Sequence, residues 1–324
     1  MIFEDLPTTP TAEELVDKAF SRAARTGRAK SGREGQESML RTAGNILSDN
    51  LENVVTAWPD FAYEVSPFYY ELADALVDVD AVRQSLNEVH WAADQIASIR
   101  DEYTSKLRKT DEETARKHRK QAFARFADIV EEVDADLDRL GTARDELKLL
   151  PDVDPEEPVI AVAGYPNVGK SAFVNAVTRA SNETASYPFT TTGIQVGHFD
   201  RDHVRYQLID TPGLLDRPAD ERNEVEQQAV SALAHAADAV LFLVDASGNC
   251  GYPLDVQLDL RDAVAATFDV PVLTICNKSD LSTDVEAEAY MSVTADENVD
   301  DVLERAAVAV GYEPDLPSRE GDRA

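Results

Sequence analysis

Cysteine is nearly absent from this 324-residue chain, which holds only Cys250 and Cys276. Two cysteines are too few for a disulfide framework or a cysteine-rich zinc site, so we expect both thiols to pack as small apolar side chains. The chain has no apolar run of about 18 residues, the minimum for a membrane-spanning helix. The segment Met1–Leu6 lacks the basic start and apolar stretch of a signal peptide. We therefore expect a soluble, cytoplasmic protein.

Positive charge is also scarce, with 31 Lys and Arg against 62 Asp and Glu and a net charge of −31. Residues 1–150 hold 20 basic against 30 acidic residues, and residues 151–324 hold 11 against 32. Self-repulsion of this size is better tolerated where salt screens it. We therefore predict a high-salt cytosol, as in a halophilic archaeon. The alternative is an acidic bacterial protein.

The basic residues gather in two segments, 18–41 and 106–125. Clustered Lys and Arg are the usual electrostatic mark of a nucleic-acid contact, and they stand out in so acidic a chain. We predict this contact for the second segment in particular, through Arg116, Lys117, Arg119 and Lys120. The alternative is a pair of solvated helix faces laced with ion pairs between residues i and i+4.

The hydrophobic periodicity changes near residue 150 and predicts two domains. Residues 1–150 carry helical patterns, expected at 11–25, 34–57, 67–76, 80–108 and 111–149. The first begins with a capping box, Thr11 to Glu14. After an acidic linker at 151–157, residues 158–312 alternate between strand and helix patterns. The fold class is therefore an α/β domain, with a mostly parallel sheet and helices on both faces, preceded by an all-α helical bundle. We expect residues 313–324 to be a disordered tail.

The segment 164–171 matches the pattern G-x-x-x-x-G-K-S directly after the apolar run 158–163. Its glycines let successive backbone N–H groups face the phosphates, and its lysine places a positive charge at the β- and γ-phosphates. Its serine hydroxyl can ligate Mg²⁺. We therefore predict a nucleoside triphosphate site built from Gly164, Tyr165, Pro166, Asn167, Val168, Gly169, Lys170 and Ser171.

Two further segments supply groups for the metal and the γ-phosphate. Asp210, Thr211, Pro212 and Gly213 follow the predicted strand 204–209. We expect Asp210 to hold Mg²⁺ through water and the Gly213 N–H to meet the γ-phosphate. The threonines at 190–192 offer a hydroxyl for the remaining Mg²⁺ position. Thr191 is our choice for that role, while its neighbours Thr190 and Thr192 leave the register open.

A third motif specifies the base. Asn277, Lys278 and Asp280 follow the apolar run 270–276 and fit N-K-x-D. A carboxylate at position 280 can accept two hydrogen bonds from guanine, whereas adenine offers no such pair of donors. Ser292 and Val293 fit the loop expected at the guanine edge. The prediction is a GTP site with Lys170, Thr191 and Gly213 as its catalytic residues.

This series of motifs resembles the Obg-like branch of the translation-factor-related P-loop GTPases. The N-terminal half is similar to the helical leader of the nucleolar GTP-binding (Nog) family, through Arg41-Thr-Ala-Gly-Asn45, Pro67-Phe-Tyr and Val89-His-Trp91. The resemblance covers about residues 10–312 and suggests an archaeal short form. It implies a factor that docks on the assembling large ribosomal subunit, on rRNA and ribosomal proteins, through its helical domain. The long C-terminal extensions of eukaryotic members are not matched.

The residue after Asp-Thr-Pro-Gly bears on the rate of hydrolysis. Position 214 is leucine, where Ras-type enzymes carry the glutamine that orients the attacking water. We therefore expect a monomeric switch with slow intrinsic GTP hydrolysis. Asn167 matches the asparagine with which related GTPases hold K⁺ beside the phosphates, and this resemblance implies a K⁺ site; the alternative is an asparagine that only completes the turn. The alternatives are a cytosolic signalling or stress GTPase with a protein partner, and a nucleotide-binding scaffold that does not hydrolyse GTP.

Overall fold

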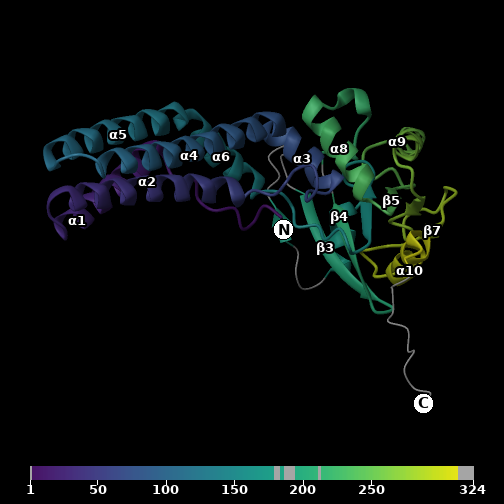
Figure 1. Ribbon diagram of the computed structural model, residues 1–324. Coiled ribbons are helices and arrows are strands. Elements are labelled where there is room, and N and C mark those ends of the chain that lie inside the picture. Colours follow the sequence, from purple (N-terminus) through teal and green to yellow (C-terminus); the bar gives the residue numbers. More distant parts are fainter. Residues whose placement is uncertain (1, 179–182, 186–193, 211–212, 313–324) are drawn as a thin grey trace, which may run out of the picture. The chain divides into compact units, whose positions relative to one another are not determined.

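The computed structural model describes residues 2–178, 183–185, 194–210 and 213–312. The chain divides into two compact units (Figure 1). One comprises residues 2–65 and 76–148, and the other comprises residues 66–75 and everything described from 149 onward. We call them the helical unit and the GTPase-fold unit.

The helical unit is a bundle of long helices. They are α1 (Ala12–Arg28), α2 (Gly32–Thr56), α4 (Val79–Leu107), α5 (Glu112–Glu132) and α6 (Asp134–Leu147). The capping box expected at Thr11 and Glu14 is present, with both reciprocal hydrogen bonds formed. Helices α2 and α4 pack along each other, and their fully buried leucines and isoleucines form the core together with Phe126 of α5.

The single helix expected over 111–149 is wrong, because two helices occupy this segment. Val133 leaves the helical region of the backbone with φ −101° and ψ 13°, and a new helix begins at Asp134. Its own first-turn acids, Asp134 and Asp136, favour a helix start at this point. The break lets α6 turn and pack on α4.

Helix α3 (Pro67–Val77) lies in the sequence between the bundle helices, but its first nine residues belong to the GTPase-fold unit. The reason is visible at Tyr69, which is 4% exposed. Its hydroxyl lies 2.9 Å from the Pro151 carbonyl and 3.0 Å from the Val153 carbonyl, and it accepts the Val153 N–H at 2.8 Å. The division expected at residue 150 therefore differs from the one observed.

The segment expected as a linker, 151–157, is held on the GTPase-fold unit. The fully buried Gln207 donates to the carbonyls of Asp154 and Glu157 at 2.8 Å and 3.1 Å, and it accepts the Asp154 N–H. These hydrogen bonds fix the chain directly before β1.

The GTPase-fold unit is built on one mixed sheet in the order β2-β3-β4-β1-β5-β6-β7. Its strands are β1 (Val159–Ala163), β2 (Glu183–Ala185), β3 (Ile194–Arg201), β4 (Val204–Asp210), β5 (Ala239–Val244), β6 (Val272–Cys276) and β7 (Ala289–Tyr290). The strands β4, β1, β5, β6 and β7 run parallel, whereas β2 and β3 pair antiparallel at one edge. Strands β1 and β5 are buried along their whole length, as expected for parallel strands covered on both faces.

Helices α7 (Lys170–Val177), α8 (Glu224–Ala236) and α9 (Leu254–Thr267) lie between strands in the sequence, with a 3₁₀ turn η1 at Ala219–Glu221 before α8. Helix α10 (Val299–Val310) follows the last strand, β7. Crossover connections of parallel strands are right-handed, so α7 covers one face of the sheet and α8 and α9 cover the other. Between β6 and β7 the chain forms no helix, as the short spacing from Asp280 to Tyr290 requires.

Candidate functional site

The candidate site lies at the carboxyl ends of four neighbouring parallel strands of the sheet. In the order β4, β1, β5, β6, the residues at or directly after these ends are Asp210, Gly164, Asp245 and Asn277. Ligands of open parallel sheets bind outside the carboxyl ends of the strands. The topology therefore brings the sequence-predicted motifs to one place.

The loop after β1 has the shape that the phosphate-binding pattern predicts. Gly164 has φ +130°, and a Cβ there would lie 2.4 Å from the Leu243 carbonyl oxygen. Gly169 has φ +108° and precedes α7, and a Cβ there would lie 2.2 Å from the Asn277 side-chain nitrogen. Only glycine fits either position. Helix α7 then points its N-terminus, with its free N–H groups and positive dipole end, toward this loop.

The Lys170 side chain points back into the phosphate-binding loop that precedes it. Its Nζ donates to the carbonyls of Gly164 and Tyr165 at 2.6 Å and 3.0 Å, and the residue is 6% exposed. Burial lowers the pKa of this ammonium, while the carboxylates of Asp216 and Asp210 counteract the shift. Lys170 is thus a buried cation held at the loop by backbone oxygens.

Two oxygen ligands meet beside the lysine. Ser171 Oγ donates to Asp210 Oδ2 at 2.5 Å, and Asp210 is fully buried at the end of β4. A hydroxyl and a carboxylate are hard oxygen ligands of the kind that Mg²⁺ prefers, and the pair therefore fits the metal that this chemistry requires. Thr190, Thr191, Thr211 and Pro212 lie outside the described residues.

Asn277 ties the guanine motif to the phosphate loop. Its side-chain nitrogen donates to the Val168 carbonyl at 2.8 Å, and its side-chain oxygen accepts the Val293 N–H at 3.3 Å. The Ser279 N–H donates to the Met291 carbonyl at 3.0 Å. The structure therefore brings Asn277 and Val293 together, beside the buried Ser292, and Asp280 is exposed.

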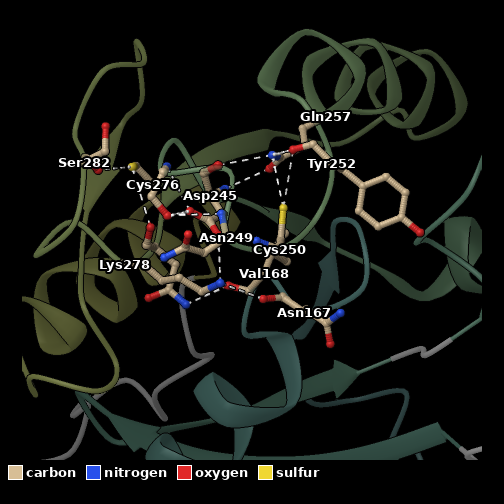
Figure 2. Close-up of polar contacts among 12 residues, drawn as sticks. Asn167, Val168, Asp245, Asn249, Cys250, Tyr252, Gln257, Cys276, Lys278 and Ser282 are labelled. Carbon is tan, nitrogen blue, oxygen red and sulfur yellow. Dashed lines mark hydrogen bonds and ion pairs between the residues drawn. The ribbon is translucent and has the colours of Figure 1, made fainter.

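Lys278 connects the same two loops from the other side (Figure 2). Its Nζ donates to the Asn167 carbonyl at 2.9 Å and to Asp245 Oδ2 at 2.7 Å. Asn167 adopts the left-handed conformation with φ +64°, which turns its carbonyl toward the lysine. In Figure 2 the Asn167 side chain points away from Lys278.

Asp245 was not predicted from the sequence. Besides Lys278, its carboxylate accepts the Ser247 and Cys250 N–H groups at 2.9 Å and 2.8 Å. Burial alone would raise the pKa of Asp245, but the hydrogen bonds from Lys278 and Ser247 hold this pKa below its usual value. The signal that could have found it is its position directly after the apolar run 239–244, at the same sheet edge as the other motifs.

A buried glutamine of α9 supports Asp245 (Figure 2). Gln257 is fully buried, and its side-chain oxygen accepts the Asp245 N–H at 2.8 Å. Its side-chain nitrogen donates to the carbonyls of Asp245 and Tyr252 at 3.1 Å and 2.9 Å. Tyr252 in turn stacks on Tyr165 of the phosphate loop, with ring centroids 4.2 Å apart. The turn after β5 is thereby fixed to both neighbouring loops.

The segment after Gly213 holds two arginines, Arg217 and Arg222, to which the sequence assigned no role. Arg217 Nε donates to the Gly213 carbonyl at 3.1 Å, and its guanidinium pairs with Glu226 of α8 at 2.6 Å. Arg222 donates to the Arg217 carbonyl at 2.9 Å. Leu214 is fully buried, so position 214 presents no polar group to a water molecule.

The two basic segments of the helical unit meet at one end of the bundle, where the α1–α2 and α4–α5 turns lie together. Arg33 Nη1 donates to the Arg108 carbonyl at 2.9 Å, and Arg119 Nε donates to Gln36 at 2.7 Å. We call this region the basic end; its exposed Lys and Arg are Arg25, Arg28, Lys30, Arg33, Lys106, Arg108, Lys109, Arg116, Lys117 and Lys120.

The four residues predicted to contact nucleic acid differ from one another. Arg116 and Lys120 are exposed and have no ion-pair partner among the described residues, whereas Lys117 pairs with Glu113 at 3.7 Å. Arg119 is partly buried, and its guanidinium lies over the Phe123 ring, 4.9 Å from the centroid. Its contacts hold α5 on its neighbours.

Comparison with known proteins identifies the family. The family described as the NOG1 N-terminal helical domain matches residues 3–154, and the 50S ribosome-binding GTPase family matches residues 159–278. An uncharacterized protein of Methanocaldococcus jannaschii is 35% identical over 289 residues, which are 86% of this chain and 81% of that relative. The chain belongs to the nucleolar GTP-binding (Nog) family.

Other Nog family members are longer. Nucleolar GTP-binding protein 1 of Arabidopsis thaliana is 34% identical over 290 residues, which are 86% of this chain and 43% of the relative. This chain thus spans less than half of the plant protein. A crystal structure of nucleolar GTP-binding protein 1 from Plasmodium falciparum covers 50% of this chain and 90% of that chain, at 32% identity and a TM-score of 0.44.

The family, the order of the two fold types and the GTPase class predicted from the sequence are confirmed. This Nog family member carries a GTPase domain, of a family that normally uses Mg²⁺. None of the helices within the described residues is long and apolar enough to cross a membrane.

Proposed function

We propose that this Nog family member is a GTP-binding switch in assembly of the large ribosomal subunit, docking through its helical unit. The observation that carries the proposal is the basic end, where two segments far apart in the sequence meet in a chain of net charge −31. The names of the matched family and relatives, a 50S ribosome-binding GTPase and nucleolar GTP-binding proteins, support the same partner.

The docking partner at the basic end is rRNA. The remainder of the chain is strongly acidic and repels phosphate, so the contact has to be local. Arg116 and Lys120 are exposed there without carboxylate partners among the described residues, which leaves their charges available to phosphates. Arg119 plays its part indirectly, because its hydrogen bond to Gln36 and its packing on Phe123 position α5.

Salt limits what charge alone can do. Phosphate contacts release counterions and weaken steeply as salt rises. In the high-salt cytosol of a halophilic archaeon, which the acidic composition favours, docking has to include shape and apolar contacts as well. Planar, weakly hydrated arginine is suited to such contacts, and the basic end contains five exposed arginines, among them Arg25 and Arg28.

The nucleotide site lies at the carboxyl ends of the parallel strands. Ser171 and Asp210 would hold Mg²⁺ there, Asp210 through water, and Thr191 would complete the protein ligands when the γ-phosphate is bound. Lys170 and the N–H of Gly213 stabilise the charge of the phosphates. Bound Mg²⁺ neutralises phosphate charge, while the residues of this chain orient the nucleotide through Asn277 and Asp280.

Hydrolysis is slow in the free protein. Leu214 is buried and apolar, so it orients no water, and Arg217 is committed to Glu226 and to the Gly213 carbonyl. A partner, or a K⁺ ion that the Asn167 side-chain oxygen would hold, would supply the missing positive charge at the phosphates and accelerate the reaction. Nucleotide state then times the release of a monomeric protein from the particle.

Sedimentation of cell extract tests the docking proposal. The protein is expected to travel with precursors of the large subunit, and Arg116→Ala/Lys120→Ala is expected to travel with them less. Arg83→Ala/Arg139→Ala is the control, because it removes two exposed positive charges of the bundle that lie outside both basic segments. Equal sedimentation of both double variants with the particles would remove the basic end from the docking surface. Absence of the wild-type protein from these particles would favour a cytosolic signalling GTPase.

A further inference from the structure

The Gly213 amide, which we expect at the γ-phosphate, already has an anionic partner in this chain. It donates to Asp216 Oδ2 at 2.9 Å. Gly213 has φ +87°, a left-handed conformation that favours glycine. The turn of 213–216 therefore places a carboxylate on the N–H group that would otherwise bind a phosphate oxygen.

The same carboxylate acts on the second phosphate-binding group. Burial lowers the pKa of Lys170, and the negative charges of Asp216 and Asp210 partly oppose this shift. Of the two carboxylates, Asp216 has the larger effect. Asp216 therefore lies within electrostatic reach of Lys170 as well as in hydrogen-bond contact with Gly213. Both groups are the ones assigned to the γ-phosphate from the sequence.

The segment around Asp216 is held in place by its own contacts. Leu214 and Leu215 are fully buried, and the Leu215 carbonyl accepts the Gly164 N–H at 3.1 Å. Arg217 bridges the Gly213 carbonyl and Glu226. The backbone on both sides of Asp216 is thus anchored, so the carboxylate is presented to Gly213 in a defined position.

We propose that Asp216 is an internal competitor of the γ-phosphate and sets the preference of this protein between GTP and GDP. A carboxylate and a phosphate cannot share one N–H donor, and their like charges repel each other. GTP therefore has to displace Asp216 from Gly213, whereas GDP, which has no γ-phosphate, leaves the contact intact. This inference rests on GTP binding by the GTPase domain and is independent of ribosomal docking.

The test compares the affinities of GDP and of a non-hydrolysable GTP analogue in the purified full chain. Asp216→Asn keeps the shape of the side chain and removes its charge, and Asp216→Ala removes both the charge and the acceptor. Each variant is expected to bind the analogue about tenfold more tightly, because a hydrogen bond to a charged group no longer has to be broken. GDP affinity is expected to stay within about twofold, which also reports that the site is folded.

Asp220→Asn is the matched control, since it removes an exposed negative charge four residues along the same segment. Its ratio of GTP-analogue to GDP affinity should equal that of the wild type. A parallel gain for both nucleotides, or an equal gain in Asp220→Asn, would reduce the effect to general electrostatics and overturn the proposal. Weaker analogue binding in Asp216→Asn would overturn it in the opposite direction and make Asp216 a ligand of the triphosphate state. A wild-type chain that binds neither nucleotide would instead refute the GTP site itself.

Discussion

Lys278 Nζ lies 2.7 Å from Oδ2 of Asp245, a carboxylate with no exposed surface. The lysine of the guanine motif is therefore held by the end of β5 as well as by the Asn167 carbonyl of the phosphate loop. A buried ion pair of this kind fixes geometry, because either partner alone would be a costly unpaired charge. The guanine loop is thus positioned by a residue outside its own motif.

Asp245→Asn is expected to weaken GDP and GTP binding by a similar factor. Asparagine keeps one side-chain oxygen, which can accept only one of the Ser247 and Cys250 N–H groups that the two carboxylate oxygens accept, and it removes the charge that orients Lys278. We expect a loss of about tenfold, from the 1.5–3 kcal/mol typical of hydrogen bonds to charged groups. Calorimetric titration measures both affinities, with the exposed Asp284→Asn as control. Unchanged affinity would show that Lys278 is positioned without Asp245.

Asp280→Asn is expected to change the base preference from guanine to xanthine nucleotides. The amide can donate to the xanthine O2, but it no longer accepts both guanine donors, and each unserved polar group costs about 1–3 kcal/mol. A competition assay with GTP, ATP and xanthosine triphosphate measures the change. If the wild-type protein bound ATP as tightly as GTP, the assignment of the base would be wrong.

Substitution of Lys170 and substitution of Thr191 should affect GDP and GTP binding differently. Lys170→Ala is expected to abolish tight binding of both GDP and GTP, because the buried ammonium faces the phosphates in either state. Thr191→Ala is expected to spare GDP and weaken GTP, because its hydroxyl is needed only when the metal and γ-phosphate are both bound. Equal losses for both nucleotides in Thr191→Ala would move the metal role to Thr190 or Thr192.

Asn167 is expected to make hydrolysis depend on K⁺. Its carbonyl is engaged by Lys278, and its side chain points away from that contact, which leaves the side-chain oxygen for a cation. Rates measured in KCl should exceed those in NaCl at equal ionic strength, and Asn167→Ala should remove the difference. Indistinguishable rates in the two salts would reduce Asn167 to a turn residue.

Tyr69→Phe is expected to destabilise the GTPase-fold unit by about 1–3 kcal/mol, because the Val153 N–H and a buried carbonyl lose their partner. Burial is the main cause that raises the pKa of Tyr69 to about 12, so the folded state favours the neutral phenol. The resulting stability is present below pH 10 and is lost as the pH rises from about 10 to 12. Denaturant unfolding of the wild type and of Tyr69→Phe between pH 10 and 12 measures both the destabilisation and its pH dependence. The Phe variant should not show the loss of stability over this range, because it has no phenol to ionise.

The phosphate and guanine motifs could be assigned from the sequence, because each has a characteristic set of residue types directly after an apolar run that predicts a strand. Parallel strands carry such residues to one edge, so Gly164, Asp210 and Asn277 could be brought together without coordinates. Asp245 follows the same rule, but it stands in no short motif, and an aspartate before a turn is common. Its role depends on the through-space contact with Lys278, 33 residues later.

Periodicity was less informative in the helical unit. It predicted helices α1, α2 and α4 within a few residues, since each has its own start and stop signals. It could not divide α5 from α6, because Val133 interrupts the helix without glycine or proline. It also assigned Tyr69 to the bundle, because an amphipathic face does not specify which neighbour covers it.

Interleaving of residues 66–75 with the GTPase-fold unit constrains how this protein is made and how it can be dissected. During synthesis these ten residues leave the ribosome long before β1. More than seventy further residues are synthesised before the segments that they pack against. The nucleotide-binding unit is therefore a discontinuous folding unit that closes only after the bundle sequence has been translated. A fragment that begins at residue 150 would lack Tyr69, and a fragment that ends there would carry it without its partners. Each cut separates Tyr69 from the Pro151 and Val153 backbone groups that it contacts, so we expect both fragments to be less stable than the full chain.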